Sequence, residues 1–228
     1  MRRVLIATPS HSGQVDVWYC NALFWTGLLC LKQEIEILPL SISYDSLIQK
    51  VRNEYITTAL ASGVDDLIFI DSDQHWKPES VPKLLSYPVD CVGGAVKKKN
   101  DNPDHYNVMC TAWPIPVDIK TGLLIVEGLG CGFLRLTRKA MQALWDSSEE
   151  YTNEAGEKHR WIFDLRPIGG RLVGEDKILG MKLTALGIKV HLDPTMTCAH
   201  VGVKKYEGDF AAFLERLGQQ RRAAKAAG

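Results

Sequence analysis

Two carboxylates one residue apart, Asp71 and Asp73, are the part of the sequence best suited to chemistry. They follow an entirely apolar run, residues 67–70, which predicts a buried strand. In a parallel sheet, ligands bind beyond the carboxyl ends of the strands. Carboxylates at such an edge would repel a diphosphate unless a divalent cation bridges the two, and hard cations prefer oxygen ligands. The pair therefore predicts a Mn²⁺ or Mg²⁺ site that serves a bound diphosphate.

The same three-residue pattern has plainer interpretations. A single Asp-x-Asp in a loop is often an ordinary turn or a helix cap. It also occurs after a strand in haloacid-dehalogenase phosphatases, but those enzymes usually carry it on the first strand. Here an apolar run at residues 4–8 already predicts an earlier strand. The position of the motif therefore favours the cation site.

Strands and helices alternate in the first half of the chain, which predicts an α/β fold with a mainly parallel central sheet and helices on both faces. The strands expected are 4–8, 34–40, 67–70 and 89–96, and the helices 17–32, 46–62 and 78–85. In the first of these helices, we expect Trp18, Leu28 and Leu29 to face the core. In the second half we expect strands at 123–126, 132–136 and 188–192, helices at 137–145, 175–186 and 209–217, and a polar mobile loop at 147–158.

Composition sets broad limits on the function. Lys and Arg number 27, as do Asp and Glu, so net charge gives no sign of a nucleic-acid partner. The longest apolar stretch, 17–31, falls short of the roughly 20 residues of a membrane span. The six cysteines lack zinc-binding spacing, which favours free thiols in a reducing compartment. We therefore expect a cytoplasmic protein, of a bacterium or of a phage-infected host.

No linker or internal repeat divides the chain. We expect one domain over residues 1–218, followed by a basic, flexible tail over residues 219–228.

Several motifs occur in an order that resembles glycosyltransferases of the GT-A fold, particularly the small family-2-like enzymes of bacteria and phages. The resemblance extends from about residue 4 to residue 202. The motifs that carry it are Ala7-Thr8-Pro9-Ser10, Arg52-Asn53, Asp71-Ser72-Asp73, residues 128–133, Gly174-Glu175-Asp176, Asp193-Pro194 and His200-Val201-Gly202. It implies a single GT-A (Rossmann-like) domain that uses a nucleotide-sugar as donor.

The resemblance also implies a donor site. The loop after the first strand would hold the base and ribose, and Arg52 would reach the phosphates with its planar fork. The metal ligands it implies are Asp71, Asp73 and His200, and the nucleotide-binding residues are Thr8, Pro9, Ser10, Arg52, Asn53, Ser72, Gly93 and Gly94. The plainer alternatives are a β–α connection, an exposed arginine, and tight turns for the glycines.

The same resemblance implies which residues act on the acceptor. Asp176 would be the general base that takes a proton from an acceptor hydroxyl, and Glu175 would assist it. The plainer alternative is helix capping, because carboxylates are favoured at a helix N-terminus. The motif favours one inverting displacement, and UDP is the expected nucleotide. The acceptor stays open between a polysaccharide, a protein and a modified DNA base.

Two rival functions fit the same fold. A sugar-nucleotide pyrophosphorylase-like nucleotidyltransferase would need a basic, Gly-rich loop after the first strand, and residues 7–13 contain neither Lys nor Arg. A non-catalytic module could instead bind nucleotides or nucleic acid through Lys97, Lys98, Lys99 and the basic tail.

Overall fold

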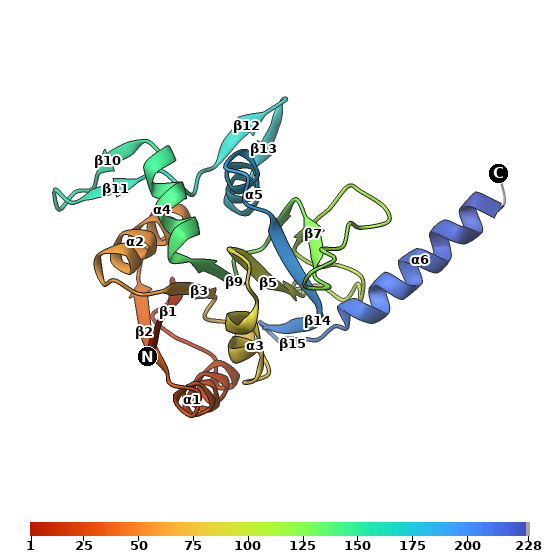
Figure 1. Cartoon of the computed structure of the whole chain (residues 1–228), viewed down its shortest axis with the longest axis horizontal. Coiled ribbons are helices and arrows are strands. Elements are labelled where there is room, and N and C mark those ends of the chain that lie inside the picture. Colours follow the sequence, from red (N-terminus) through yellow and green to blue (C-terminus); the bar gives the residue numbers. More distant parts are fainter. Residues whose placement is uncertain (227–228) are drawn as a thin grey trace.

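A mixed, mainly parallel sheet forms the centre of the computed structural model, which describes residues 1–226 (Figure 1). Its strands lie in the order β15-β14-β5-β9-β3-β1-β2, and β4 and β7 pair with β14. The strands are β1 (Arg2–Ser10), β2 (Ile35–Ser43), β3 (Asp66–Ile70), β4 (Gln74–His75), β5 (Cys91–Val96), β7 (Leu124–Val126), β9 (Phe133–Thr137), β14 (Val190–Val201) and β15 (Lys205–Tyr206).

Strand direction confirms the expected fold class. β1 pairs in parallel with both β2 and β3, and β5 pairs in parallel with β14. β9 lies antiparallel between β3 and β5. The helices that flank the sheet are α1 (Val17–Leu31), α2 (Ile48–Ala61), α3 (Ser80–Ser86), α4 (Arg138–Ser147), α5 (Glu175–Ala185) and α6 (Phe210–Ala226).

Alternation along the strands divides the core between the two faces of the sheet. Leu67 and Phe69 of β3 pack in the cluster that includes side chains of α2, α4 and α5. Ile68 and Ile70 pack in the cluster that includes side chains of α1 and α3. Figure 1 shows these two sets of helices on opposite sides of the sheet. Every residue of β3 is buried, as the apolar run 67–70 predicts.

Short strand pairs lie outside the central sheet. They are β6 (Val108–Met109) with β8 (Gly128–Leu129), β10 (Glu150–Thr152) with β11 (Lys158–Arg160), and β12 (Arg166–Ile168) with β13 (Arg171–Val173). The prediction of a loop at 147–158 is wrong, because β10 lies in this segment and pairs with β11 to form an antiparallel hairpin. The β12–β13 hairpin was not predicted.

Both ends of the chain differ from expectation. The last helix was expected to stop at residue 217, but α6 continues to Ala226 and projects from the body of the molecule (Figure 1). Its last turns, which belong to the predicted flexible tail, are therefore helical; residues 227–228 lie outside the described part. In α1, Trp18, Leu28 and Leu29 were expected in the core, but Trp18 and Leu28 are exposed, as is Phe24, and Leu29 is only partly buried.

Two further observations concern the cysteines and the helices. All six cysteines are free, in agreement with the prediction from their spacing. Among residues 1–226, no helix combines the length and the apolar character that crossing a membrane requires.

Candidate active site

The turn that carries Asp71 and Asp73 leaves the carboxyl end of β3 and is fixed by its backbone. The amide of Asp71 donates to the carbonyl of Gly132 over 3.3 Å. The amide of Val201, at the end of β14, donates to the carbonyl of Asp73 over 2.8 Å. These bonds attach the turn to β9 on one side and β14 on the other. Both carboxylates are therefore held at the edge of the sheet where ligands bind in parallel α/β folds.

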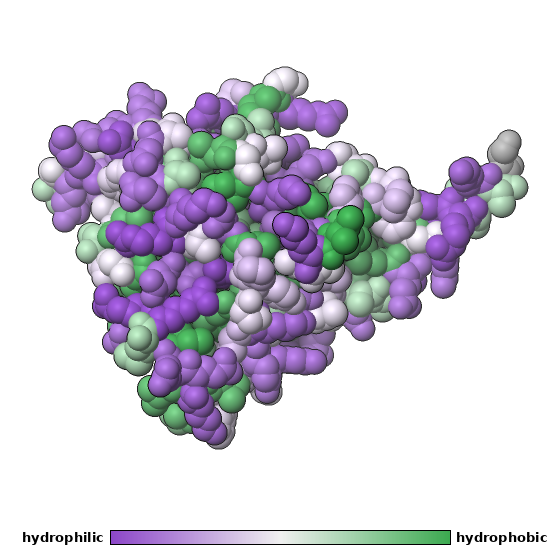
Figure 2. Space-filling model, viewed as in Figure 1, coloured by the Kyte–Doolittle hydropathy of each residue, from purple (hydrophilic) through white to green (hydrophobic). Residues whose placement is uncertain are grey.

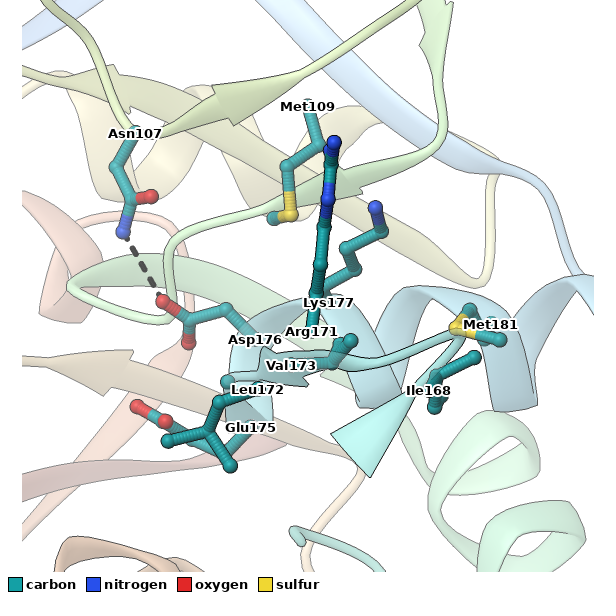
Figure 3. A pocket seen from close by; sticks show the side chains of 11 residues that line it. Asn107, Met109, Ile168, Arg171, Leu172, Val173, Glu175, Asp176, Lys177 and Met181 are labelled. Carbon is teal, nitrogen blue, oxygen red and sulfur yellow. Dashed lines mark hydrogen bonds between the residues drawn. The ribbon is translucent and has the colours of Figure 1, made fainter. Parts of the chain in front are cut away.

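Three adjoining cavities surround this edge. The first, the β1 cavity, has a volume of about 240 Å³. The second, the lysine cavity, is lined by Lys97, Lys98 and Lys99 and measures about 250 Å³. The third, the α5 cavity, lies at the start of α5 and measures about 490 Å³ (Figure 3).

Shared wall residues connect the cavities into a row. Asp71 and His200 line both the β1 cavity and the lysine cavity. Asn107 and Asp176 line both the lysine cavity and the α5 cavity. A ligand in the middle cavity would therefore face Asp71 and His200 on one side and Asp176 on the other.

Asp73 lies between two basic groups. Nε2 of His200 is 3.2 Å from Oδ1 of Asp73, and Nζ of Lys99 contacts Oδ2. Burial raises the pKa of the Asp73 carboxyl, but the hydrogen bonds from His200 and Lys99 outweigh this effect and lower the pKa to about 2. Asp73 is therefore ionised at neutral pH.

Arg52 occupies the centre of the acidic group. Its side chain is only 4% exposed, and its two terminal nitrogens face opposite ways. Nη2 donates to Asp71 over 3.2 Å, while Nη1 donates to Glu175 over 2.9 Å and to Asp176 over 3.2 Å. Burial raises the pKa of the Asp71 carboxyl, and the guanidinium opposes this shift. Arg52 therefore holds the two acidic motifs together.

Asp176 uses both carboxylate oxygens. Oδ1 accepts hydrogen bonds from Arg52 and from the backbone amide of Cys131, at 3.2 and 3.0 Å. Oδ2 accepts one bond, of 3.0 Å, from Nδ2 of Asn107, which Figure 3 shows as a dashed line. Sequence reasoning missed Asn107, because it lies in an irregular segment with no recognisable motif. Lys99 was noted only as part of a lysine run.

Gly130 makes room for this arrangement. A Cβ atom there would overlap the side chain of Asn107, whereas a Cβ at Gly27 in α1 would meet nothing within 4 Å. We expect Gly130→Ala to displace Asn107 and break its bond to a charged partner, with a loss of about 1.5–3 kcal/mol in the free energy of unfolding. Gly27→Ala, the matched control, should gain about 0.4–1 kcal/mol. Urea denaturation checks both, and equal effects of the two substitutions would contradict the packing described.

The side chains at Asp71, Asp73 and His200 fit a partly protein-bound divalent cation. Carboxylate oxygens suit Mg²⁺ and Mn²⁺, and imidazole suits Mn²⁺ better than Mg²⁺. Among residues 1–226 there is no group of three or more His, Cys, Asp or Glu side chains close enough to hold a metal ion. A cation here would therefore need ligands from a bound diphosphate and water, as nucleotide-associated Mg²⁺ commonly does.

Of the residues assigned to the nucleotide, some line the β1 cavity and the others are bonded inside the fold. Pro9, Ser10 and Ser72 line the β1 cavity together with the acidic turn. The hydroxyl of Thr8 is buried and bonded to that of Tyr19.

The other assigned residues serve the framework. Asn53 is buried and accepts from the amides of Ile162 and Phe163, at 3.1 and 2.8 Å. Gly93 and Gly94 lie inside β5, where a Cβ at Gly93 would be 2.6 Å from the carbonyl of Phe133. Arg52 lies beneath the acidic residues and lines none of the three cavities.

Comparison with known proteins shows similarity at the level of fold. No protein-family model and no curated protein sequence matches this chain. The crystal structure of A197 from STIV superposes with a TM-score of 0.54 at 17% identity, covering 89% of this chain and 86% of that one. The chain therefore shares its fold with A197.

Weaker likenesses include transferases of two classes. The inositol-1-phosphate CTP transferase from T. maritima gives a TM-score of 0.43 at 10% identity, over 88% of this chain and 89% of that one. A glycosyltransferase involved in the glycosylation of the major capsid of PBCV-1 gives 0.34 at 10% identity, over 61% and 62%.

Proposed function

We propose that this chain is a metal-dependent glycosyltransferase that moves a sugar from a nucleoside-diphosphate-sugar to an acceptor hydroxyl. The position of Asp176 supports this proposal most directly. It lies in the wall between the lysine cavity, which also contains Asp71 and His200, and the α5 cavity. A base between a diphosphate site and a second, larger cavity is what transfer between two substrates requires.

The donor would occupy the β1 and lysine cavities. Pro9 and Ser10 would contact the nucleoside, and Lys99, at the rim, would donate to a phosphate oxygen. Asp71, Asp73 and His200 would hold the divalent cation, which supplies positive charge to balance the leaving diphosphate. Without such a cation, the carboxylates would repel the donor.

The acceptor hydroxyl would approach from the α5 cavity. Oδ2 of Asp176 carries a single hydrogen bond, from Asn107, and is therefore the oxygen we assign to receive the proton. As the acceptor oxygen bonds to the anomeric carbon, the bond from that carbon to the diphosphate oxygen breaks, and the diphosphate takes the electron pair. Attack from the side opposite to the leaving group inverts the anomeric centre.

Ligand-dependent thermal stability tests the donor proposal. A nucleoside diphosphate with Mn²⁺ should raise the Tm, because a ligand that binds only the folded state stabilises it by about 2.7 kcal/mol at 100 times its Kd. UDP is the expected nucleotide. Asp73→Asn should abolish the Mn²⁺-dependent part of the shift. If no nucleoside diphosphate shifts the Tm with Mn²⁺, the proposal is wrong.

Product analysis separates the transferase from its rivals. A transferase should slowly hydrolyse the nucleotide-sugar to free sugar and nucleoside diphosphate when no acceptor is present. A nucleotidyltransferase should instead release sugar phosphate and nucleoside triphosphate when pyrophosphate is added. A binding module should do neither.

A further inference from the structure

The outer wall of the α5 cavity is apolar and open to solvent. Leu172, Met181 and Ile168 line it and are 70%, 45% and 38% exposed. They come from the β12–β13 hairpin and from α5. In Figure 2, apolar residues gather at the surface over this part of the molecule. Exposed apolar side chains grouped around a cavity mark a binding surface more often than the solitary exposed ones do.

Two cations line the same cavity, and neither is part of a close ion pair among the residues that the structure describes. Arg171 and Lys177 line the α5 cavity, and neither forms an ion pair within the described residues 1–226. Figure 3 shows both side chains extending in the same direction, toward Met109. By contrast, the acids of this cavity, Glu175 and Asp176, already bind Arg52. Arg171 lies directly across the hairpin from Ile168, and Lys177 is close enough to Glu127 to help lower the pKa of that carboxyl. Both cations thus lie on the same cavity as the apolar side chains.

We propose that the acceptor is an anionic amphiphile, a hydroxyl compound that carries a phosphate and an aliphatic chain. This inference rests on the proposed function, since it places the acceptor hydroxyl at Asp176. The aliphatic chain lies against Leu172, Met181 and Ile168, and the phosphate binds Arg171 and Lys177. The cavity of about 490 Å³ holds the head of such a molecule, and its open side lets the chain extend outward.

The lining chemistry argues against a plain saccharide or a nucleic acid. A saccharide that extended over the outer wall would place hydroxyl groups against Leu172, Met181 and Ile168, which offer no hydrogen bonds, and none of the residues that line the cavity is aromatic. A nucleic acid would need cations along the track of its backbone, and this wall offers only Arg171 and Lys177.

Direct binding tests the inference on the full chain by calorimetry. The probe is lauroyl lysophosphatidic acid, which carries a phosphate, a free hydroxyl and one aliphatic chain, used below its micelle concentration. Glycerol phosphate lacks the chain, and monolauroylglycerol lacks the phosphate. We expect the complete probe to bind about tenfold or more tightly than either fragment. Comparable binding of glycerol phosphate would identify a site for free phosphate and overturn the inference.

Substitutions locate the binding site. Leu172→Asp and Arg171→Ala should each weaken probe binding by about tenfold or more. Both side chains are exposed, so the fold should persist. Phe24→Ser, on the exposed face of α1, and Lys225→Ala, on α6, are the matched controls and should change nothing. Equal weakening by the controls, or no effect of the cavity substitutions, would show adsorption elsewhere and refute the inference.

Measurements of nucleotide binding distinguish a failure of the proposed function from a failure of the inference about the acceptor. If nucleoside diphosphate and Mn²⁺ raise the Tm but the amphiphile does not bind, only the inference about the acceptor fails. If the amphiphile binds at this wall but no nucleotide does, the proposed function fails and the acceptor assignment with it. When both bind, mass spectrometry should detect the lipid with one sugar added, and absence of that product with every nucleotide-sugar that binds would also overturn the inference.

Discussion

Asp176→Asn is expected to slow sugar transfer by about 10²- to 10⁴-fold, the usual contribution of a positioned general base. Asparagine keeps the shape of the side chain, and its oxygen can still accept from Arg52 and the amide of Cys131. Asn107 can turn its own amide so that its oxygen faces the new NH₂ group. The fold should therefore survive, and the loss should reflect the missing proton acceptor.

Binding and rate must be measured together for this variant. Donor binding, read from the Tm shift with nucleotide and Mn²⁺, should be unchanged, while kcat falls. Glu175→Gln is the matched control, because Glu175 also binds Arg52 but lines only the α5 cavity. A larger loss of kcat for Glu175→Gln than for Asp176→Asn would transfer the role of base to Glu175.

Arg52→Met is expected to lower the free energy of unfolding by about 3–5 kcal/mol, because removing one partner of a buried ion pair leaves the others uncompensated. For a chain of this size the Tm should fall on the order of 10 °C. Three carboxylates, those of Asp71, Glu175 and Asp176, would lose their shared cation. Methionine fills a similar volume, so the effect is mainly electrostatic.

The pH dependence of the stability lost in Arg52→Met tests whether the loss is electrostatic. The pKa of Asp71 is already raised, and removal of Arg52 should raise it further. A carboxyl whose folded pKa lies above its unfolded value stabilises the fold when protonated and loses this contribution as the pH rises. The deficit of Arg52→Met should therefore shrink as the pH falls.

A surface arginine gives the matched control. Arg216→Met removes a guanidinium that pairs with Asp104, where both side chains are exposed by more than a third. Exposed pairs contribute about 0–1 kcal/mol, so the Tm should barely change. If Arg216→Met and Arg52→Met destabilise equally, Arg52 is not the electrostatic centre of the site.

Local sequence patterns predicted the features that depend on neighbouring residues. An apolar run followed by Asp71 and Asp73 specified a buried strand and the edge where it ends, because strand burial and strand direction are encoded locally. The start of α5 at Glu175 was likewise visible from the preceding Gly174. These predictions placed both acidic motifs on the correct elements.

Contacts across the fold could not be predicted in the same way. Arg52 was assigned to the phosphates from the resemblance, but its ion pairs with Asp71 and Glu175 were not foreseen. Asn107 reaches Asp176 only because Gly130 leaves space for it. Each of these depends on the packing of segments distant in sequence, for which a single sequence carries no periodic signal.

Arg52 binds the carboxylates of both acidic motifs, those at Asp71 and at Glu175-Asp176, and so connects the donor side of the site to the acceptor side. Its guanidinium donates hydrogen bonds to Asp71 through Nη2 and to Glu175 and Asp176 through Nη1. We therefore expect a ligand that displaces the guanidinium from Asp71 to change its bonds to Glu175 and Asp176 as well. Thermodynamic reciprocity then requires that, if donor loading alters acceptor affinity by some factor, acceptor loading alters donor affinity by the same factor.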